Sequence, residues 1–283
     1  MKTIAIYHKD CTDGTGAAAV VLKKYPDALA YPLGHGFEAH ELEPILASAE
    51  AGDRILCVDC AIGAKEFLAK GLPVTVIDHH AGMNAELKEI AAKDKNLAYI
   101  FDNSKSGASL TWATLFPGEK APELIKYIED QDLWNWKYGK DTKDVNNSIF
   151  TLANKPEEIV KLFDVPLDVL KKEGAVISRY NDHMIDHMVK TTEPLTLKVG
   201  EWKVPMYNIT VHKSEGGNLL SKERNAAVGL FSIDGDKVKI SFRSIDSQKP
   251  DALDVAKALG GGGHRNSSGA GMNLADFLAS ISK

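Results

Sequence analysis

The chain has 283 residues, of which 44% are hydrophobic and 26% are charged, a balance typical of a folded globular protein rather than a disordered one. It contains no run of about 18 apolar residues, and its apolar start is too short for a signal peptide, so we expect neither a membrane span nor secretion. Three cysteines without a disulfide framework favour a reducing, cytoplasmic location. The net charge of −5 combines −7 over residues 1–190 with +2 over residues 191–283, and so acidic a body argues against binding to long duplex nucleic acid.

The first 80 residues alternate between predicted strands and predicted helices. Helices are expected where apolar residues recur before a stop at Pro26 and at Gly71. The strands are apolar throughout, which indicates a parallel sheet that is covered on both faces. The predicted strands are 3–7, 28–33, 54–58 and 74–77, and the predicted helices are 17–24 and 64–70.

Helices dominate after residue 100, and strands return near residue 195. The predicted helices are 107–116, 122–130 and 156–189, and the predicted strands are 195–199, 227–231 and 238–243. We therefore expect an α/β protein with a parallel-sheet domain over 1–190. Its last helix would serve as a linker to a smaller α/β domain over 191–283.

Side chains that can bind metals follow three of the apolar strands. His8, Asp10 and Asp13 come after the first strand, Asp59 after the third, and the run Asp78-His79-His80 after the fourth. Ligands of open α/β sheets bind at the carboxyl ends of the strands, so we expect these side chains to meet at one edge of the sheet.

A further acidic cluster, residues 129–132, ends a predicted helix. Negative charge opposes the helix dipole at that end, which favours a functional role. The sequence leaves the choice between Asp130 and Asp132 open. Carboxylates combined with imidazoles suit Mn²⁺ or Mg²⁺ better than zinc, and two ions would relieve the repulsion between so many anionic ligands.

The cysteines give weaker signals than the carboxylates. Cys57 and Cys60 have the spacing of half a zinc site, but without a second pair they are expected to pack in the core. Cys11 lies among the first polar residues and has no additional histidine nearby in the sequence to serve as its base.

A glycine-rich segment, 260–270, lies near the end of the chain. Glycines let backbone amides approach an anion closely, and a neighbouring histidine and arginine can add charged donors. Arg243, at the end of a predicted strand, is a further candidate for binding phosphate. The candidate substrate-binding residues of this half are Arg243, Gly261, Gly262, Gly263, His264 and Arg265.

This order of motifs resembles the DHH phosphoesterases, a family that includes RecJ-type exonucleases, nanoRNA-degrading enzymes, cyclic-dinucleotide phosphodiesterases and pyrophosphatases. The glycine-rich segment resembles the motif of the family's associated C-terminal domain. The resemblance implies that Asp59 bridges two metal ions, that His79 is a metal ligand and that His80 contacts the substrate phosphate. It also implies that Asp78 holds the neighbouring histidines in place. The other metal ligands that it implies are His8, Asp10, Asp13 and Asp130 or Asp132.

One departure from the family pattern concerns Asp10. The family's first motif usually separates its two acids by one residue, whereas two residues separate Asp10 from Asp13, and Cys11 occupies a neighbouring position. Residues 102–108 resemble the segment that opens a helix in the family, which makes them a candidate anion site.

The resemblance implies a phosphodiesterase or phosphohydrolase that cleaves phosphate esters of nucleotides or short oligonucleotides by metal-activated water. Two Mn²⁺ ions, or Mg²⁺, would bind in a cleft between the domains. Two alternatives stay open: hydrolysis of polyphosphate or pyrophosphate, and an inactive nucleic-acid-binding scaffold. We expect no membrane partner, and a homo-oligomer is compatible with the sequence. Aromatic residues of the second half could either stack bases or pack in the core: Trp202, Tyr207, Phe231 and Phe242.

Overall fold

The computed structural model describes residues 1–34 and 37–282, and the chain divides into two compact units, Met1–Ser178 and Arg179–Lys283. The division falls inside a long helix, α9 (Leu167–Thr191), before the boundary expected near residue 190. The assignment of catalysis to residues 1–190 and of substrate binding to residues 191–283 stays a prediction. Within the described ranges, no helix combines the length and apolar character needed to cross a bilayer.

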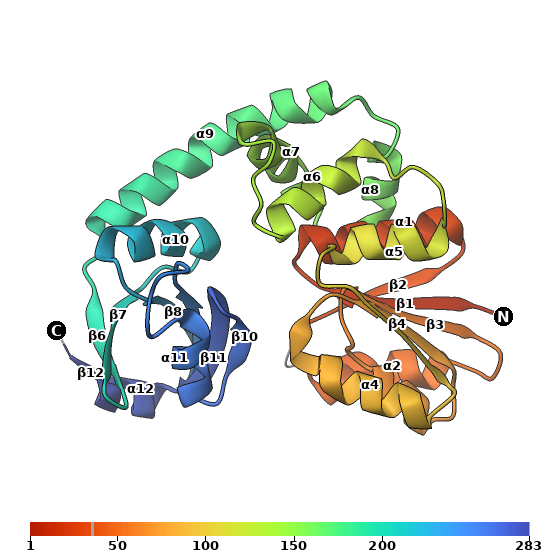
Figure 1. Ribbon diagram of the computed structural model, residues 1–283, viewed down its shortest axis with the longest axis horizontal. Coiled ribbons are helices and arrows are strands. Elements are labelled where there is room, and N and C mark those ends of the chain that lie inside the picture. The colour runs from red at the N-terminus through yellow and green to blue at the C-terminus, as the bar shows by residue number, and fades with distance from the viewer. Residues whose placement is uncertain (35–36, 283) are drawn as a thin grey trace. The chain divides into compact units, whose positions relative to one another are not determined.

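The first unit is built on a five-stranded parallel sheet in the order β2-β1-β3-β4-β5 (Figure 1). After β2 the chain returns past β1 to form β3, so the direction of the connections reverses between β1 and β3. In open α/β sheets, ligands bind beyond the carboxyl ends of the strands at such a switch point. The strands are β1 (Thr3–His8), β2 (Leu29–Leu33), β3 (Arg54–Val58), β4 (Val74–Asp78) and β5 (Leu97–Phe101).

Helices cover both faces of this sheet, and each face has its own apolar core. Figure 1 shows α1 and α5 on one face and α2 and α4 on the other. In β1, Ala5 and Tyr7 belong to the first core and Ile4 and Ile6 to the second, which is why the strand is apolar throughout. The α/β fold predicted from the sequence is confirmed. The helices of the first core are α1 (Thr12–Lys24), α5 (Gly107–Leu115), α6 (Glu123–Asp132), α7 (Lys140–Phe150) and α8 (Pro156–Leu162); those of the second are α2 (Ala39–Ser48), α3 (Ala64–Ala69) and α4 (Asn84–Lys93), which follows the short 3₁₀ helix η1 (Ala81–Met83).

Helix α1 begins at Thr12, earlier than the expected start at residue 17. Its first turn therefore includes Asp13 and Gly14. A Cβ atom on Gly14 would stand 2.2 Å from the carbonyl oxygen of His8, so glycine is required where the helix starts against the end of β1. This close approach places Asp13 at the carboxyl edge of the sheet.

The helix expected over 156–189 is divided into α8 and α9. Pro166 lies directly before α9, a position that suits proline because the first helical N–H groups need no partner within the helix. Gly174, the other breaker in this stretch, lies within α9 and does not interrupt it.

The second unit contains a seven-stranded mixed sheet in the order β10-β11-β9-β8-β7-β6-β12. β7 pairs with β8 in parallel, and the other neighbours pair antiparallel. Tyr207, Phe231 and Phe242 are buried, so these three candidates for base stacking serve the interior instead. The strands are β6 (Leu195–Val199), β7 (Trp202–Tyr207), β8 (Val228–Asp234), β9 (Lys237–Arg243), β10 (Gly262–His264), β11 (Ser267–Asn273) and β12 (Ile281–Ser282); the helices are α10 (Lys213–Arg224), α11 (Ala252–Ala258) and α12 (Leu274–Ser280).

Candidate metal centre

Three neighbouring strands of the first unit end in polar residues at the switch point. His8 is the last residue of β1, Asp59 directly follows β3, and Asp78 is the last residue of β4. The backbone N–H of Asp59 donates to the carbonyl of Ile77, with 2.9 Å between nitrogen and oxygen. Asp59 has a φ of 57°, a left-handed conformation in which aspartate is enriched, and its side chain is only 1% exposed.

The imidazole of His79 lies at the middle of a cluster of carboxylates. Its Nε2 atom is 3.2 Å from Asp59 Oδ1, 3.5 Å from Asp132 Oδ2 and 3.9 Å from Asp13 Oδ2. On the other side of Asp59, Oδ2 lies 3.7 Å from His8 Nδ1. The structure therefore brings together five of the predicted ligands, although they come from widely separated parts of the sequence.

These side chains form three overlapping groups that could each hold a metal ion, with the donor atoms of each group within 4.8 Å of one another. Asp59 belongs to two of the groups, and His79 also belongs to two. Cys11 belongs to one of them, although the sequence analysis did not count it as a ligand. The groups are His8–Cys11–Asp59, Asp59–His79–His80 and Asp13–His79–Asp132.

Two of these side chains have polar atoms that lack a hydrogen-bond partner. Among the described residues, Asp59 Oδ1, Asp59 Oδ2 and His79 Nε2 are buried and accept or donate no hydrogen bond. Buried polar atoms in folded proteins are nearly always satisfied, because an unpaired one loses its hydration without compensation. Carboxylate and imidazole donors around this space fit a divalent cation.

The ionisation of the cluster reflects an excess of buried negative charge. Burial, reinforced by the charges of Asp132 and Asp59, raises the pKa of Asp13 well above its usual range. Burial and the charge of Asp59 likewise raise the pKa of Asp132 to about 6. Burial alone would lower the pKa of His79, but the surrounding carboxylates raise it to about 9. A bound cation would compensate the same charge.

The imidazoles have the opposite effect on Asp59. Burial alone would raise the pKa of its carboxyl group, but His79 and His8 outweigh burial and hold that pKa below its ordinary value. Asp59 is therefore ionised in the folded chain, as a ligand must be.

The start of α5 holds Asp13 in place. The backbone N–H of Gly107 donates to Asp13 Oδ2 at 2.6 Å, and that of Ala108 donates to Asp13 Oδ1 at 3.0 Å. The first amides of a helix are free to bind an anion, and here the anion is a side chain of the protein itself. The expected anion site of residues 102–108 is thus occupied by Asp13.

Asp78 orients His80 rather than His79. Its Oδ1 accepts a hydrogen bond from the backbone N–H of His80 at 3.1 Å and lies 2.7 Å from His80 Nδ1. Burial alone would lower the pKa of His80, but this contact with Asp78 and the charge of Asp59 raise it. The His80 side chain is 28% exposed, so part of its ring is accessible to a ligand.

Asp10 lies outside the cluster. Its backbone is left-handed, with φ 58°, and its exposed carboxylate accepts a hydrogen bond from Asn154 Nδ2 at 2.6 Å. The backbone N–H of Asp10 donates to Asn154 Oδ1 at 2.9 Å. The predicted ligand role of Asp10 is not supported by these contacts, because its carboxylate binds the segment before α8 instead.

Asp130 also lies outside the cluster, and Asp132 is the acid of this helix end that joins it. Asp130 accepts hydrogen bonds from the backbone N–H groups of Lys137 and Tyr138 at 2.9 and 3.2 Å, and from the Thr142 hydroxyl. Its carboxylate is thus satisfied by the segment between α6 and α7, so the structure separates two acids that the sequence could not.

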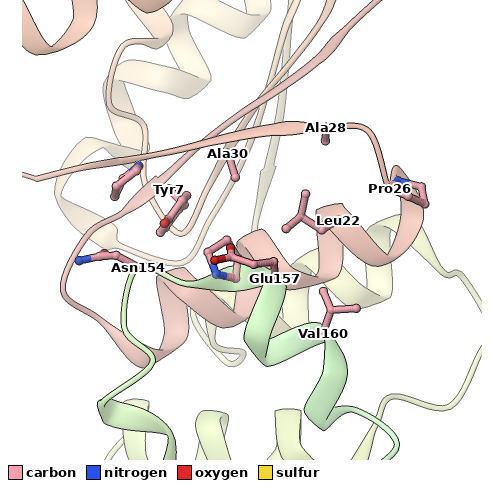
Figure 2. A pocket seen from close by; sticks show the side chains of 10 residues that line it. Tyr7, Leu22, Pro26, Ala28, Ala30, Asn154, Glu157 and Val160 are labelled. Carbon is pink, nitrogen blue, oxygen red and sulfur yellow. The ribbon is translucent and has the colours of Figure 1, made fainter.

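A pocket of about 440 Å³ lies elsewhere in the first unit, beside β2 and the start of α8. Figure 2 shows Tyr7 and Asn154 at one end of this pocket and Pro26 at the other. None of the gathered ligands is among the residues that line it. The candidate ligands converge at the strand ends instead.

Comparison with known proteins gives a family match for the C-terminal part of the chain. Residues 203–283 match the model of the DHHA1 domain. The chain carries a DHHA1 domain. A viral relative, the uncharacterized protein R106 of Acanthamoeba polyphaga mimivirus, is 26% identical over 289 residues, which cover 94% of this chain and 66% of that protein. The chain therefore spans just under two thirds of this relative's length.

Two solved structures of RecJ share the fold. Exonuclease RecJ bound to manganese matches with a TM-score of 0.56 and 15% identity, over 98% of this chain and 88% of that one. RecJ from Thermus thermophilus in complex with Mn²⁺ matches with a TM-score of 0.54 and 15% identity, over 98% of this chain and 50% of that one. The resemblance to the DHH family is confirmed in the fold and in the DHHA1 match.

The glycine-rich segment of the DHHA1 domain forms a hairpin, β10–β11. The N–H of Gly261 already donates to the carbonyl of Ala256 at 2.8 Å, so it is not free to bind an anion. Gly262 and Gly263 lie in β10, the edge strand, which is paired on one side. His264 is exposed, and Arg265 donates to the carbonyl of Asp246 at 2.5 Å. Substrate binding by this segment stays a prediction.

Arg243 lies at the start of α10 with two residues that the sequence analysis missed. Its Nη2 donates to Ser214 Oγ at 3.0 Å and its Nη1 to the Phe242 carbonyl at 2.9 Å. Burial, together with the nearby charge of Arg243, lowers the pKa of Lys213. Two cations at a helix N-terminus form a positive site suited to phosphate. Lys213 and Ser214 begin α10, and a lysine and a serine at the start of a helix could have indicated this site. The sequence did not lead us to predict α10, so the signal was missed.

Proposed function

We propose that the chain is a metal-dependent phosphoesterase that hydrolyses phosphate esters of nucleotides or short oligonucleotides, with Mn²⁺ as its metal and Mg²⁺ as a substitute. One observation carries the proposal: both carboxylate oxygens of Asp59 are buried without a hydrogen-bond partner among the described residues, and Asp59 belongs to two donor groups at once. A carboxylate shared in this way can hold two adjacent cations, the arrangement that clamps a phosphoryl group during in-line displacement.

Divalent cations at this position would activate a water molecule and neutralise charge on the phosphoryl group. The chain's own residues divide the remaining work. Asp59 and His79, which each belong to two donor groups, link the three groups into one cluster. His80, held by Asp78, presents a partly exposed ring that would donate a hydrogen bond to a phosphate oxygen.

The DHHA1 domain would bind the rest of the substrate. Arg243 and Lys213 at the start of α10 provide positive charge on the second unit. Binding energy from such remote groups helps to position the reacting phosphorus. The acidic first unit needs this contribution, because without bound cations its cluster would repel a phosphate.

A pair of aromatic rings near the cluster supports nucleotides over polyphosphate as substrates. Trp134 follows Asp132 by two residues, is 40% exposed, and has its ring centroid 4.9 Å from that of Trp136 in an edge-to-face arrangement. Exposed aromatic rings can stack on nucleobases, which polyphosphate lacks. Hydrolysis is also preferred to an inactive scaffold, since a scaffold has no use for buried carboxylates that repel one another.

A substrate panel tests the proposal. Metal-free protein supplemented with Mn²⁺ would be offered di- to pentanucleotides, cyclic dinucleotides, adenosine bisphosphate and polyphosphate, and released products would be measured by chromatography. We expect cleavage of one of the nucleotide classes, and loss of that cleavage in Asp59→Asn. Asp53→Asn is the matched control, because Asp53 is a buried carboxylate at the opposite end of β3 that accepts a hydrogen bond from the Lys2 backbone. Cleavage of polyphosphate alone, or of nothing, would contradict the proposal.

A further inference from the structure

The one half-buried cysteine among the three cysteines of the chain lies inside the donor cluster. Cys11 precedes the first turn of α1, and its Sγ is within 4.8 Å of a ring nitrogen of His8 and a carboxylate oxygen of Asp59. The other two thiols point to backbone carbonyls: Cys57 Sγ lies 3.4 Å from the Ile62 oxygen, and Cys60 Sγ lies 3.9 Å from the Ile6 oxygen.

A second, independent observation marks the space beside Cys11 as a ligand site. Asp59 is 1% exposed, and neither of its carboxylate oxygens has a hydrogen-bond partner among the described residues. One of these oxygens completes the group with Cys11 and His8. A buried carboxylate that faces an imidazole and a sulfur, and that accepts no hydrogen bond from the described part of the chain, is arranged to share a cation with them.

We propose that Cys11 is a metal ligand and that the position it forms with His8 and Asp59 has a mixed sulfur, nitrogen and oxygen donor set. On binding, the thiol releases its proton to solvent and the sulfur coordinates as thiolate. This inference rests on the proposed metal centre and adds to it that the two positions differ. Thiolate favours softer ions such as Co²⁺ and Zn²⁺, whereas the group Asp13–His79–Asp132 retains the oxygen-rich donors that suit Mn²⁺ or Mg²⁺.

Titration with cobalt detects coordination by the thiolate sulfur directly and does not depend on catalytic activity. Full-length, metal-free protein would be titrated with Co²⁺ while the near-ultraviolet absorption of thiolate-to-cobalt charge transfer and the visible ligand-field bands are recorded. We expect the charge-transfer band in the wild type and in the control Cys57→Ala. Cys11→Ser and Cys11→Asp should lose that band, and Cys11→Asp should keep cobalt binding in the visible bands.

Competition between metals gives a second readout. Cys11→Asp replaces sulfur with oxygen in the donor set, so the ratio of Co²⁺ to Mn²⁺ affinity should fall by about tenfold or more in this variant, whereas Cys57→Ala should leave that ratio unchanged. Bound Co²⁺ should also slow alkylation of Cys11 by iodoacetamide in the wild type.

Persistence of the charge-transfer band in Cys11→Ser, or cobalt binding without the band in the wild type, would overturn the inference. Failure of the wild type to bind cobalt at all would overturn both the proposed metal centre and the role of Cys11. A protein that shows the band but cleaves no phosphate ester would refute the proposed function and leave the sulfur ligand standing.

Discussion

Replacing Gly107 with alanine tests how closely the start of α5 packs against the proposed metal centre. A methyl group at this position would stand 2.5 Å from both Cβ and Oδ1 of Asp59 and 2.8 Å from its Cγ. Ordinary contact begins near 3.4 Å, so either Asp59 or the start of α5 must move by about 0.9 Å. The same glycine donates its N–H to Asp13, so the shift disturbs two proposed ligands at once.

The structure allows the size of the effect to be estimated. Overpacking of a buried site costs roughly 1–3 kcal/mol of stability, and disturbing the support of metal ligands weakens metal affinity by about 10- to 100-fold. Isothermal titration calorimetry of metal-free Gly107→Ala with Mn²⁺ would measure the affinity. Circular dichroism and thermal unfolding without metal would report whether the fold is retained.

Gly82→Ala is the matched control. Gly82 lies in η1, two residues after His80, and a Cβ atom there would meet nothing within 4 Å. This variant should bind Mn²⁺ as the wild type does. If Gly107→Ala also bound Mn²⁺ with wild-type affinity, Asp59 and Asp13 could not be ligands held against α5, and the reasoning from this contact would be refuted.

Further substitutions separate the residues that the sequence grouped together. Asp132→Asn should weaken Mn²⁺ binding in calorimetry without lowering the stability of the metal-free protein. Asp130→Asn should instead lower the free energy of unfolding by about 1–3 kcal/mol, because the three groups that donate to Asp130 lose a charged acceptor. The reverse pattern would contradict the assignment of Asp132 to the site. Asp10→Asn should keep metal affinity and turnover, since its carboxylate binds Asn154, and a loss of Mn²⁺ binding would return it to the site. Arg243→Ala should raise KM for a dinucleotide more than it lowers kcat in steady-state assays, and an unchanged KM would exclude Arg243 from substrate binding.

The position of the site could be predicted because its signal is local. His8, Asp59 and Asp78 each come at the end of an apolar strand, and parallel strands bring their carboxyl ends to one edge. The continuous apolar character of β1 similarly indicated a sheet covered on both faces, because each face has its own core.

The choice between Asp130 and Asp132 could not be made from the sequence. Both residues lie in the last turn of α6. Because they are two positions apart, their side chains point in directions about 200° apart around the helix axis. Which side faces the sheet depends on how α6 packs, a tertiary property. Trp134 and Trp136 both have a left-handed backbone conformation, and the chain turns back there. This turn brings residues 137–142 to Asp130.

The arrangement of the first motif could not be predicted for a related reason. The sequence counted Asp10 as a donor and left Cys11 out, but the left-handed backbone at Asp10 turns the chain there. The carboxylate of Asp10 then meets Asn154, and the sulfur of Cys11 lies beside Asp59. A single residue with positive φ changes which neighbour reaches the site, and no spacing rule reports it.

Metal reconstitution of dinucleotide cleavage is the most direct test of the central claim, that the cluster around Asp59 binds the cations that drive phosphate-ester hydrolysis. Wild-type protein treated with a chelator and dialysed would be assayed on a dinucleotide before and after addition of Mn²⁺, beside Asp59→Asn and Asp53→Asn. We predict no cleavage without metal, restored cleavage on adding Mn²⁺ to the wild type and to Asp53→Asn, and a loss of several orders of magnitude in Asp59→Asn. Cleavage by the metal-free wild type, or restoration in Asp59→Asn to the wild-type rate, would contradict the claim.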